Sequence, residues 1–183
     1  MSSSRDASDT AGTFWPYSLE LYGCPGLPEL LIAAQDDCGA DVNLLLWMCW
    51  LAATRAVSAE PADLQGADAA IAQLRAEVVM PLRDVRRALK RNTRWMARAD
   101  LEAVRQKVKS SELDAERVVQ LTLEGYAGSR WSSMGPAADG EAVDPERARG
   151  ALGRSLANYA SFLGCRLDPQ LEERLSTSLC IPC

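Results

Sequence analysis

The sequence predicts an all-α, single-domain helical bundle, and three observations lead to this fold class. The 183 residues are close to the size of one domain. Residues that favour helices, such as alanine, leucine, arginine and glutamate, are abundant, while no alternating strand pattern occurs. The segment 42–57 contains eight consecutive apolar residues, Leu44 to Leu51, so every face of a helix built from it is apolar. Because this run is shorter than the roughly 20 residues of a membrane span, we expect a buried central helix.

Capping residues and glycines set the expected elements of the first third. A short helix begins after Thr13 and ends at Gly23, and a second begins at 27 with Pro28 in its first turn. Gly39 ends this second helix, and Asp41 caps the central helix. Residues 58–63 are expected to form a loop around Pro61. The polar residues 1–12 are expected to be a disordered tail that precedes a helical domain over 13–179.

The later segments show helical spacing with one apolar and one cationic face. The apolar face carries Val78, Leu82, Val85, Leu89 and Met96, and the cationic face carries Arg83, Arg87, Lys90, Arg94 and Arg98. Pro81 is expected to kink this helix or to mark its start. Asp100 restarts a helix, and Ser111 with Asp114 resembles a capping box for a separate one. After a loop over 128–144, Asp-Pro pairs at 144–145 and 168–169 open the last two helices.

Composition excludes several classes of catalytic site. The chain contains no histidine, which excludes Ser-His-Asp and Cys-His catalysis and any histidine-ligated metal. We find neither a secretory signal nor a transmembrane segment, so we expect a cytoplasmic protein whose six cysteines stay reduced. Cys180 and Cys183 supply only half of a tetrahedral zinc site, and we expect free thiols on a short tail, 180–183. No cofactor and no metal are predicted.

Charge is distributed unevenly along the chain. The net charge is −5, but residues 83–109 contain ten lysines and arginines against three acidic residues, a net charge of +7, so the remainder carries −12. This asymmetry marks a site for acidic partners or helices of one protein that pair with each other.

The segment FWPYSLELYGCPGLPELLIAAQDDCGADVNLLLWMCWLA, followed by VVMPLRDVRRALK at 78–90, is similar to the signature of a known protein family. It resembles an uncharacterised family of small bacterial, mostly proteobacterial, conserved hypothetical proteins. The resemblance covers residues 14–90 and extends more weakly to about residue 163. It implies a helical, cytoplasmic protein without an assigned activity, and it brings no catalytic residues.

The pair Asp36 and Asp37 departs from local rules, because negative charge is unfavourable at the C-terminal end of a helix by about 0.3–1 kcal/mol per group. One interpretation is an ion pair with the cationic stripe of Arg83, Arg87 and Lys90. A second makes Asp36, Asp37, Asp41 and Asn43 an oxygen-ligand site for Mg²⁺. An aspartate pair on a helix also resembles prenyl-transferring enzymes, which need a second acidic motif that is not evident here.

The stripe from Arg83 to Arg98 has its own alternatives. It is a solvated or internally paired face, a site for an acidic protein surface, or a site for nucleic-acid phosphates. The acidic chain, the single interleaved aromatic residue Trp95 and the lack of any nucleic-acid motif disfavour nucleic acid. The aromatic residues Trp15, Tyr17, Tyr22, Trp47 and Trp50 are expected in the core rather than in a ligand cage.

From these patterns we expect a non-enzymatic protein that binds a macromolecule, a protein rather than a nucleic acid or a membrane. The expected binding residues are Asp36, Asp37, Asp41, Asn43, Arg83, Arg87, Lys90 and Arg94. The alternative is an enzyme or ligand-binding protein whose carboxylate–arginine pocket holds a phosphorylated or Mg-bridged small molecule. The oligomeric state is not predicted by the sequence.

Overall fold

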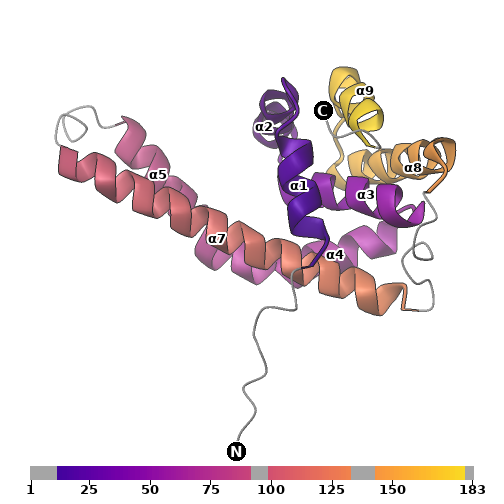
Figure 1. Ribbon diagram of the computed structural model, residues 1–183, viewed down its shortest axis with the longest axis horizontal. Coiled ribbons are helices and arrows are strands. Elements are labelled where there is room, and N and C mark those ends of the chain that lie inside the picture. The colour runs from indigo at the N-terminus through magenta and orange to yellow at the C-terminus, as the bar shows by residue number, and fades with distance from the viewer. Residues whose placement is uncertain (1–11, 92–98, 133–142, 180–183) are drawn as a thin grey trace, which may run out of the picture. The chain divides into compact units, whose positions relative to one another are not determined.

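In a computed structural model, the protein consists of helices joined by turns (Figure 1). The structure describes residues 12–91, 99–132 and 143–179. These residues contain no strand, which confirms the all-α class. They form two compact units: unit 1 comprises 12–58 and 143–179, and unit 2 comprises 59–91 and 99–132. That 13–179 is a single domain stays a prediction. The expected tails, 1–12 and 180–183, lie outside the described residues except for residue 12.

Unit 1 is built around α3 (Val42–Arg55), the predicted central helix. Its other helices are α1 (Phe14–Tyr22), α2 (Leu27–Cys38), α8 (Pro145–Leu163) and α9 (Pro169–Ser178). Within this unit α3 lies against α1, α2 and α8 (Figure 1). Trp47 and Trp50 are 0% and 2% exposed, so the prediction of a buried centre is confirmed. Tyr22, in contrast, is exposed, and its expected place in the core is wrong.

The helix ends of unit 1 follow the capping pattern of the sequence. The side chains of Asp41, Asp144 and Asp168 each accept a hydrogen bond from a backbone N–H in the first turn that follows. Gly39 ends α2 with the left-handed backbone that favours glycine. Thr13 lies at the expected position before α1 but does not cap it. Its hydroxyl instead accepts a hydrogen bond from the indole N–H of Trp50, at 3.2 Å, and so joins α1 to the central helix.

The expectation that all cysteines stay reduced is wrong for Cys24, Cys38 and Cys165, which are disulfide-bonded. Cys38, the last residue of α2, and Cys165, in the turn after α8, form a disulfide bond. Their Cα atoms are 5.9 Å apart, within the range that a disulfide spans. Their separation of 127 positions in the sequence hid this proximity. Cys49 behaves as predicted for a core residue: it is fully buried, and burial raises the pKa of its thiol.

Unit 2 is a pair of long helical segments that lie side by side (Figure 1). The first segment runs without a break through α4 (Pro61–Leu74), the π-helix η1 (Arg75–Val79) and α5 (Met80–Arg91). The second is α7 (Ala99–Arg130). Pro81 lies in the first turn of α5, so it marks the point where η1 passes into α5 rather than the start of a separate helix. The preceding π-turn, in which Met80 N–H donates to the carbonyl of Arg75, changes the backbone pattern just before the proline that has no N–H to donate.

Three expected boundaries in unit 2 are wrong. The loop around Pro61 ends at Glu60, because Glu60 and Asp63 form a capping box that opens α4. Ser111 does not begin a new helix: its hydroxyl donates to the carbonyl of Lys107 one turn earlier, and α7 passes through without a break. The loop expected from 128 begins later, since α7 continues to Arg130.

Candidate partner-binding site

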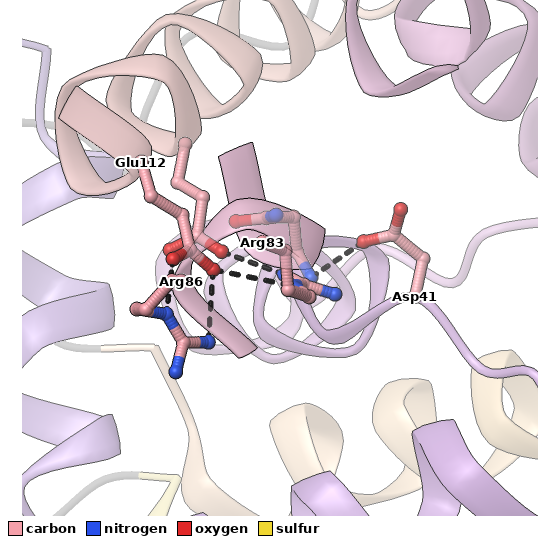
Figure 2. A network of polar contacts seen from close by, with 6 residues as sticks. Asp41, Arg83, Arg86 and Glu112 are labelled. Carbon is pink, nitrogen blue, oxygen red and sulfur yellow. Dashed lines mark hydrogen bonds and ion pairs between the residues drawn. The ribbon is translucent and has the colours of Figure 1, made fainter. Parts of the chain in front are cut away.

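Two arginines of α5 turn inward and share one carboxylate of α7. Glu112, whose side chain is only 8% exposed, accepts a hydrogen bond from Arg83 Nε at 3.2 Å and two from Arg86, through Nε and Nη2. Arg83 also donates through Nη2 to Glu116, at 2.8 Å. Figure 2 shows the Glu112 carboxylate between the two guanidinium groups. This network pairs part of the predicted stripe inside unit 2.

The network changes the ionisation of its members in a consistent way. Burial raises the pKa of Glu112 and is the largest single effect, but the hydrogen bonds and charges of Arg86 and Arg83 together outweigh it. The pKa of Glu112 is therefore lowered from its ordinary value. The hydrogen bond that Arg86 donates to Glu112 raises the pKa of Arg86 in turn. Glu112 is thus a charged, fixed part of the hairpin formed by α5 and α7 rather than a proton donor or acceptor at neutral pH.

Beyond this network the same side of the hairpin is positively charged. Arg87 and Lys90 follow Arg83 and Arg86 by one helical turn, and Lys109 precedes Glu112 by nearly one turn. All three are exposed, and we call them the cationic flank. Glu102, an acidic side chain nearby on α7, is held by Arg105 at 2.5 Å, and the hydrogen bond from Arg105 lowers the pKa of Glu102 to about 2.

The acidic corner between α2 and α3 is divided between exposed and structural residues. Asp36 and Asp37 are exposed near the end of α2. Asp41 is the N-cap of α3, where its carboxylate accepts a hydrogen bond from the backbone N–H of Asn43 at 2.8 Å. The backbone N–H of Asp41 donates to the hydroxyl of Tyr159 at 2.8 Å, which ties the corner to α8. Asn43 is buried. Asp41 and Asn43 therefore have a structural role at the start of α3.

The structure brings some of the predicted site residues together and leaves others apart. Arg83 joins a cluster with Arg86, Glu112 and Glu116, which the sequence analysis did not include. Asp36, Asp37, Asp41 and Asn43 belong to unit 1, whereas Arg83, Arg87 and Lys90 belong to unit 2. The pairing of Asp36 or Asp37 with the arginine stripe stays a prediction. Arg94 lies outside the described residues.

Two general features of the described residues bear on possible sites. In the part of the chain that the structure describes, no three cysteine or acidic side chains gather so that they could hold a metal ion, so the Mg²⁺ interpretation of the corner gains no support. Over the same residues, no helix combines the length and the apolar character that crossing a membrane requires.

Comparison with known protein families gives one match. Residues 13–123 match the model of a protein family of unknown function, DUF2390, which is more than half of the chain. The chain belongs to the DUF2390 family. No curated protein and no solved structure matches it. The matched segment extends from the residue before α1 into α7, so it contains the acidic corner, the Arg83–Arg86–Glu112–Glu116 network and the cationic flank. Tyr159 and Cys165 lie outside the DUF2390 match.

Proposed function

We propose that this member of the DUF2390 family is a non-enzymatic protein that binds an acidic protein surface through the cationic flank. The observation that carries the proposal is the division of cations along the hairpin. Arg83 and Arg86 are engaged by buried or half-buried carboxylates, whereas Lys90 and Lys109 are exposed beyond them on the same side. Exposed cations of one sign raise the local concentration of oppositely charged partners and accelerate their association.

A protein partner fits this flank better than nucleic acid. Proteins that bind single-stranded nucleic acid combine cations with aromatic side chains on which bases stack. In α5 and the described part of α7 around the flank, 80–91 and 101–112, the sequence has no aromatic residue. The chain as a whole is acidic, with a net charge of −5, which disfavours long contacts with a polyanion beyond the flank itself.

Binding of defined polyanions by the full chain tests the proposal. A fluorescently labelled polyglutamate peptide serves as the acidic protein probe, and a DNA oligomer of equal charge serves as the nucleic-acid probe. The variant Lys90→Gln/Lys109→Gln should bind the peptide at least tenfold more weakly, and added salt should weaken wild-type binding. The matched control is Arg147→Gln/Arg149→Gln, which removes two exposed cations from α8.

The outcomes separate the alternatives. Equal loss of peptide binding in the α8 control would show that net charge, rather than the flank, attracts the probe. Tighter binding of the DNA oligomer than of the peptide, lost in the same lysine variant, would replace the protein partner with nucleic acid. Unchanged binding of both probes by the lysine variant would reject the flank as a binding site.

The cellular location is a separate part of the proposal. Disulfide bonds persist in oxidising compartments and are rare in a reducing cytosol. The Cys38–Cys165 bond therefore bears against the cytoplasmic location that the sequence suggests, and that location stays a prediction. Alkylation of free thiols in intact cells, followed by mass spectrometry of the peptides that contain Cys38 and Cys165, decides whether the pair is oxidised where the protein works.

A further inference from the structure

The side of the hairpin opposite the cationic flank exposes apolar side chains in a regular pattern. Apolar residues at 78, 82, 85 and 89 recur at steps of four and three, and those at 104, 108, 115 and 118 follow the same spacing with Ser111 in place of one apolar residue. This is the spacing of helices that pack along a seam. An inner row of Leu82, Leu89, Val108 and Ala115 packs between α5 and α7, with Leu89 and Ala115 only 9% and 8% exposed. An outer row is formed by Val78, Val85, Val104 and Val118, and these valines are 37–49% exposed.

The four outer valines lie on one side of the hairpin. On α5, Arg83 and Arg86 lie on one flank of the inner row, and Val85 lies on the other. On α7, Glu112 and Glu116 likewise lie on one flank of the inner row and the outer valines on the other. Because the arginines and glutamates of the two helices bond to each other, the valines of both helices come together on the opposite side.

Charged residues just behind the outer row indicate what covers it. On α7 these are Lys107 and Asp114, which lie close to the valines around the helix, and on α5 they are Asp84 and Arg91, which lie about 100° farther around the helix than Val85, at the outer edge of this face. Each pair has opposite charges seven residues apart, so its members lie on the same face two turns from one another. All four side chains are exposed. The charge on this rim therefore changes sign along the hairpin, being positive towards the α5–α7 connection and negative away from it.

The two charge pairs are level with each other. The Arg86–Glu112 hydrogen bonds place these residues opposite one another across the antiparallel helices. The midpoint of Asp84 and Arg91 comes shortly after Arg86 on α5, and the midpoint of Lys107 and Asp114 comes the same distance before Glu112 on α7. Because the two helices run in opposite directions, these midpoints lie at the same level. A two-fold axis that is perpendicular to the helices and level with both midpoints therefore brings the acidic position of each helix opposite the basic position of the same helix in a second copy.

We propose that a second copy of this chain covers the outer valine row, with the two hairpins antiparallel about this two-fold axis. Asp84 then faces Arg91 of the second copy, and Lys107 faces Asp114 of the second copy, each contact occurring twice as in any two-fold interface. The same axis sets Val104 against Val118 of the second copy. A parallel arrangement would place like charges together. Surface ion pairs contribute little affinity, so burial of the valines provides the affinity of the dimer, and the charges determine that the two hairpins pack antiparallel.

This interface goes beyond the proposed binding of an acidic partner and does not depend on it. Lys90 and Lys109 lie on the side of the hairpin that the second copy leaves uncovered. A dimer would therefore present two cationic flanks, one on each copy. The two proposals fail separately, because the lysine variant above leaves the valine row intact and the variants below leave the flank intact.

Sedimentation of the full chain over a range of concentrations tests the dimer. Wild type should associate to twice its 19.9 kDa mass. The variant Val104→Ser/Val118→Ser should weaken association at least tenfold, whereas Leu113→Ser/Leu121→Ser, which changes exposed leucines away from the row, should not. Circular dichroism checks that each variant keeps its helices.

A charge exchange tests the direction of packing independently of folding. Lys107→Asp alone and Asp114→Lys alone should each weaken the dimer, and the double variant Lys107→Asp/Asp114→Lys should restore it. Ser111, which lies close to the proposed axis on α7, should link to itself across the two copies when changed to cysteine, whereas Ser129→Cys should not.

Three results would overturn the proposal. The first is a wild-type chain that stays monomeric at every concentration reached. The second is a dimer that is indifferent to the serine variants, which would place the interface elsewhere. The third is a combination of two observations: the double charge variant dimerises no better than the single variants, and Ser111→Cys forms no disulfide between copies. This combination would show that the valines meet a partner in some other register.

Discussion

The buried carboxylate of Glu112 allows a prediction whose size follows from the structure. Glu112→Gln keeps the shape of the side chain and removes the charge that Arg83 and Arg86 share. Breaking a buried ion pair by removing one partner costs about 3–5 kcal/mol. The side chains of Arg83 and Arg86 are 21% and 29% exposed, so water recovers part of their hydration. We therefore expect the free energy of unfolding to fall by about 3 kcal/mol at pH 7, the lower end of that range.

The loss at Glu112 should depend on pH in a definite direction. Its pKa in the folded protein lies below the ordinary value of 4.5. A carboxyl group of this kind stabilises the fold fully above the pKa of the unfolded chain, and this contribution is lost as the pH falls through the lower, folded pKa. The difference between wild type and Glu112→Gln should stay constant from pH 7 to about pH 5 and shrink below the ordinary pKa.

Urea unfolding at pH 7 and pH 3 measures this difference. Circular dichroism follows the helices of both units, so separate transitions of the units would be visible as more than one step. Glu102→Gln is the matched control, because it removes an exposed carboxylate of the same helix and should leave the midpoint nearly unchanged. A loss below about 1 kcal/mol, typical of surface pairs, or a loss equal at both pH values would refute the reasoning.

Three further predictions concern packing and cross-linking. Trp50→Ala should lower the free energy of unfolding by about 3–5 kcal/mol, as for other emptied large core sites, and a loss under about 1 kcal/mol in urea would contradict its role in the centre of unit 1. The Cys38–Cys165 bond should contribute about 2–4 kcal/mol, so without reductant Cys38→Ser/Cys165→Ser should melt at a lower temperature than wild type, and a reductant should lower the melting temperature of wild type more than that of the variant. A Cβ atom at Gly66 would lie 2.2 Å from the hydroxyl oxygen of Tyr126, so Gly66→Ala should cost about 1–3 kcal/mol, and this cost should shrink in the background of Tyr126→Leu.

The elements of unit 1 could be predicted because their signals are local. Asp41, Asp144 and Asp168 cap helices through bonds to residues two positions away, and the apolar run of α3 requires burial whatever surrounds it. The same kind of local signal led to a wrong prediction at Ser111, where a new helix was expected to begin. A serine that can cap a helix can equally bond to the carbonyl one turn earlier, and only packing of a long α7 against α5 decides between the two.

The candidate site was predicted only in part, because its decisive contacts join distant segments. The cationic stripe was visible from the spacing of Arg83 and Arg87, but its carboxylate partners are Glu112 and Glu116, about 30 residues away on α7. Their own spacing of four residues was a usable signal, since it puts two acidic side chains on one face of a helix. The Cys38–Cys165 bond had no such signal, because residues that end two different helices meet only once the helices are packed.

The ion-pair network between α5 and α7 bears on why the outer valine row is exposed. Arg83, Arg86 and Glu112 occupy space between α5 and α7, while four valines face outward, although burying apolar groups is favourable and buried ion pairs add little net stability. This arrangement is unfavourable for an isolated hairpin and becomes favourable once the valines are covered. If a second copy covers them, association stabilises the folded state by mass action. The unfolding midpoint of unit 2 should then rise with protein concentration in wild type and become independent of concentration in Val104→Ser/Val118→Ser. A midpoint independent of concentration in both proteins would mean that the hairpin tolerates its exposed row alone.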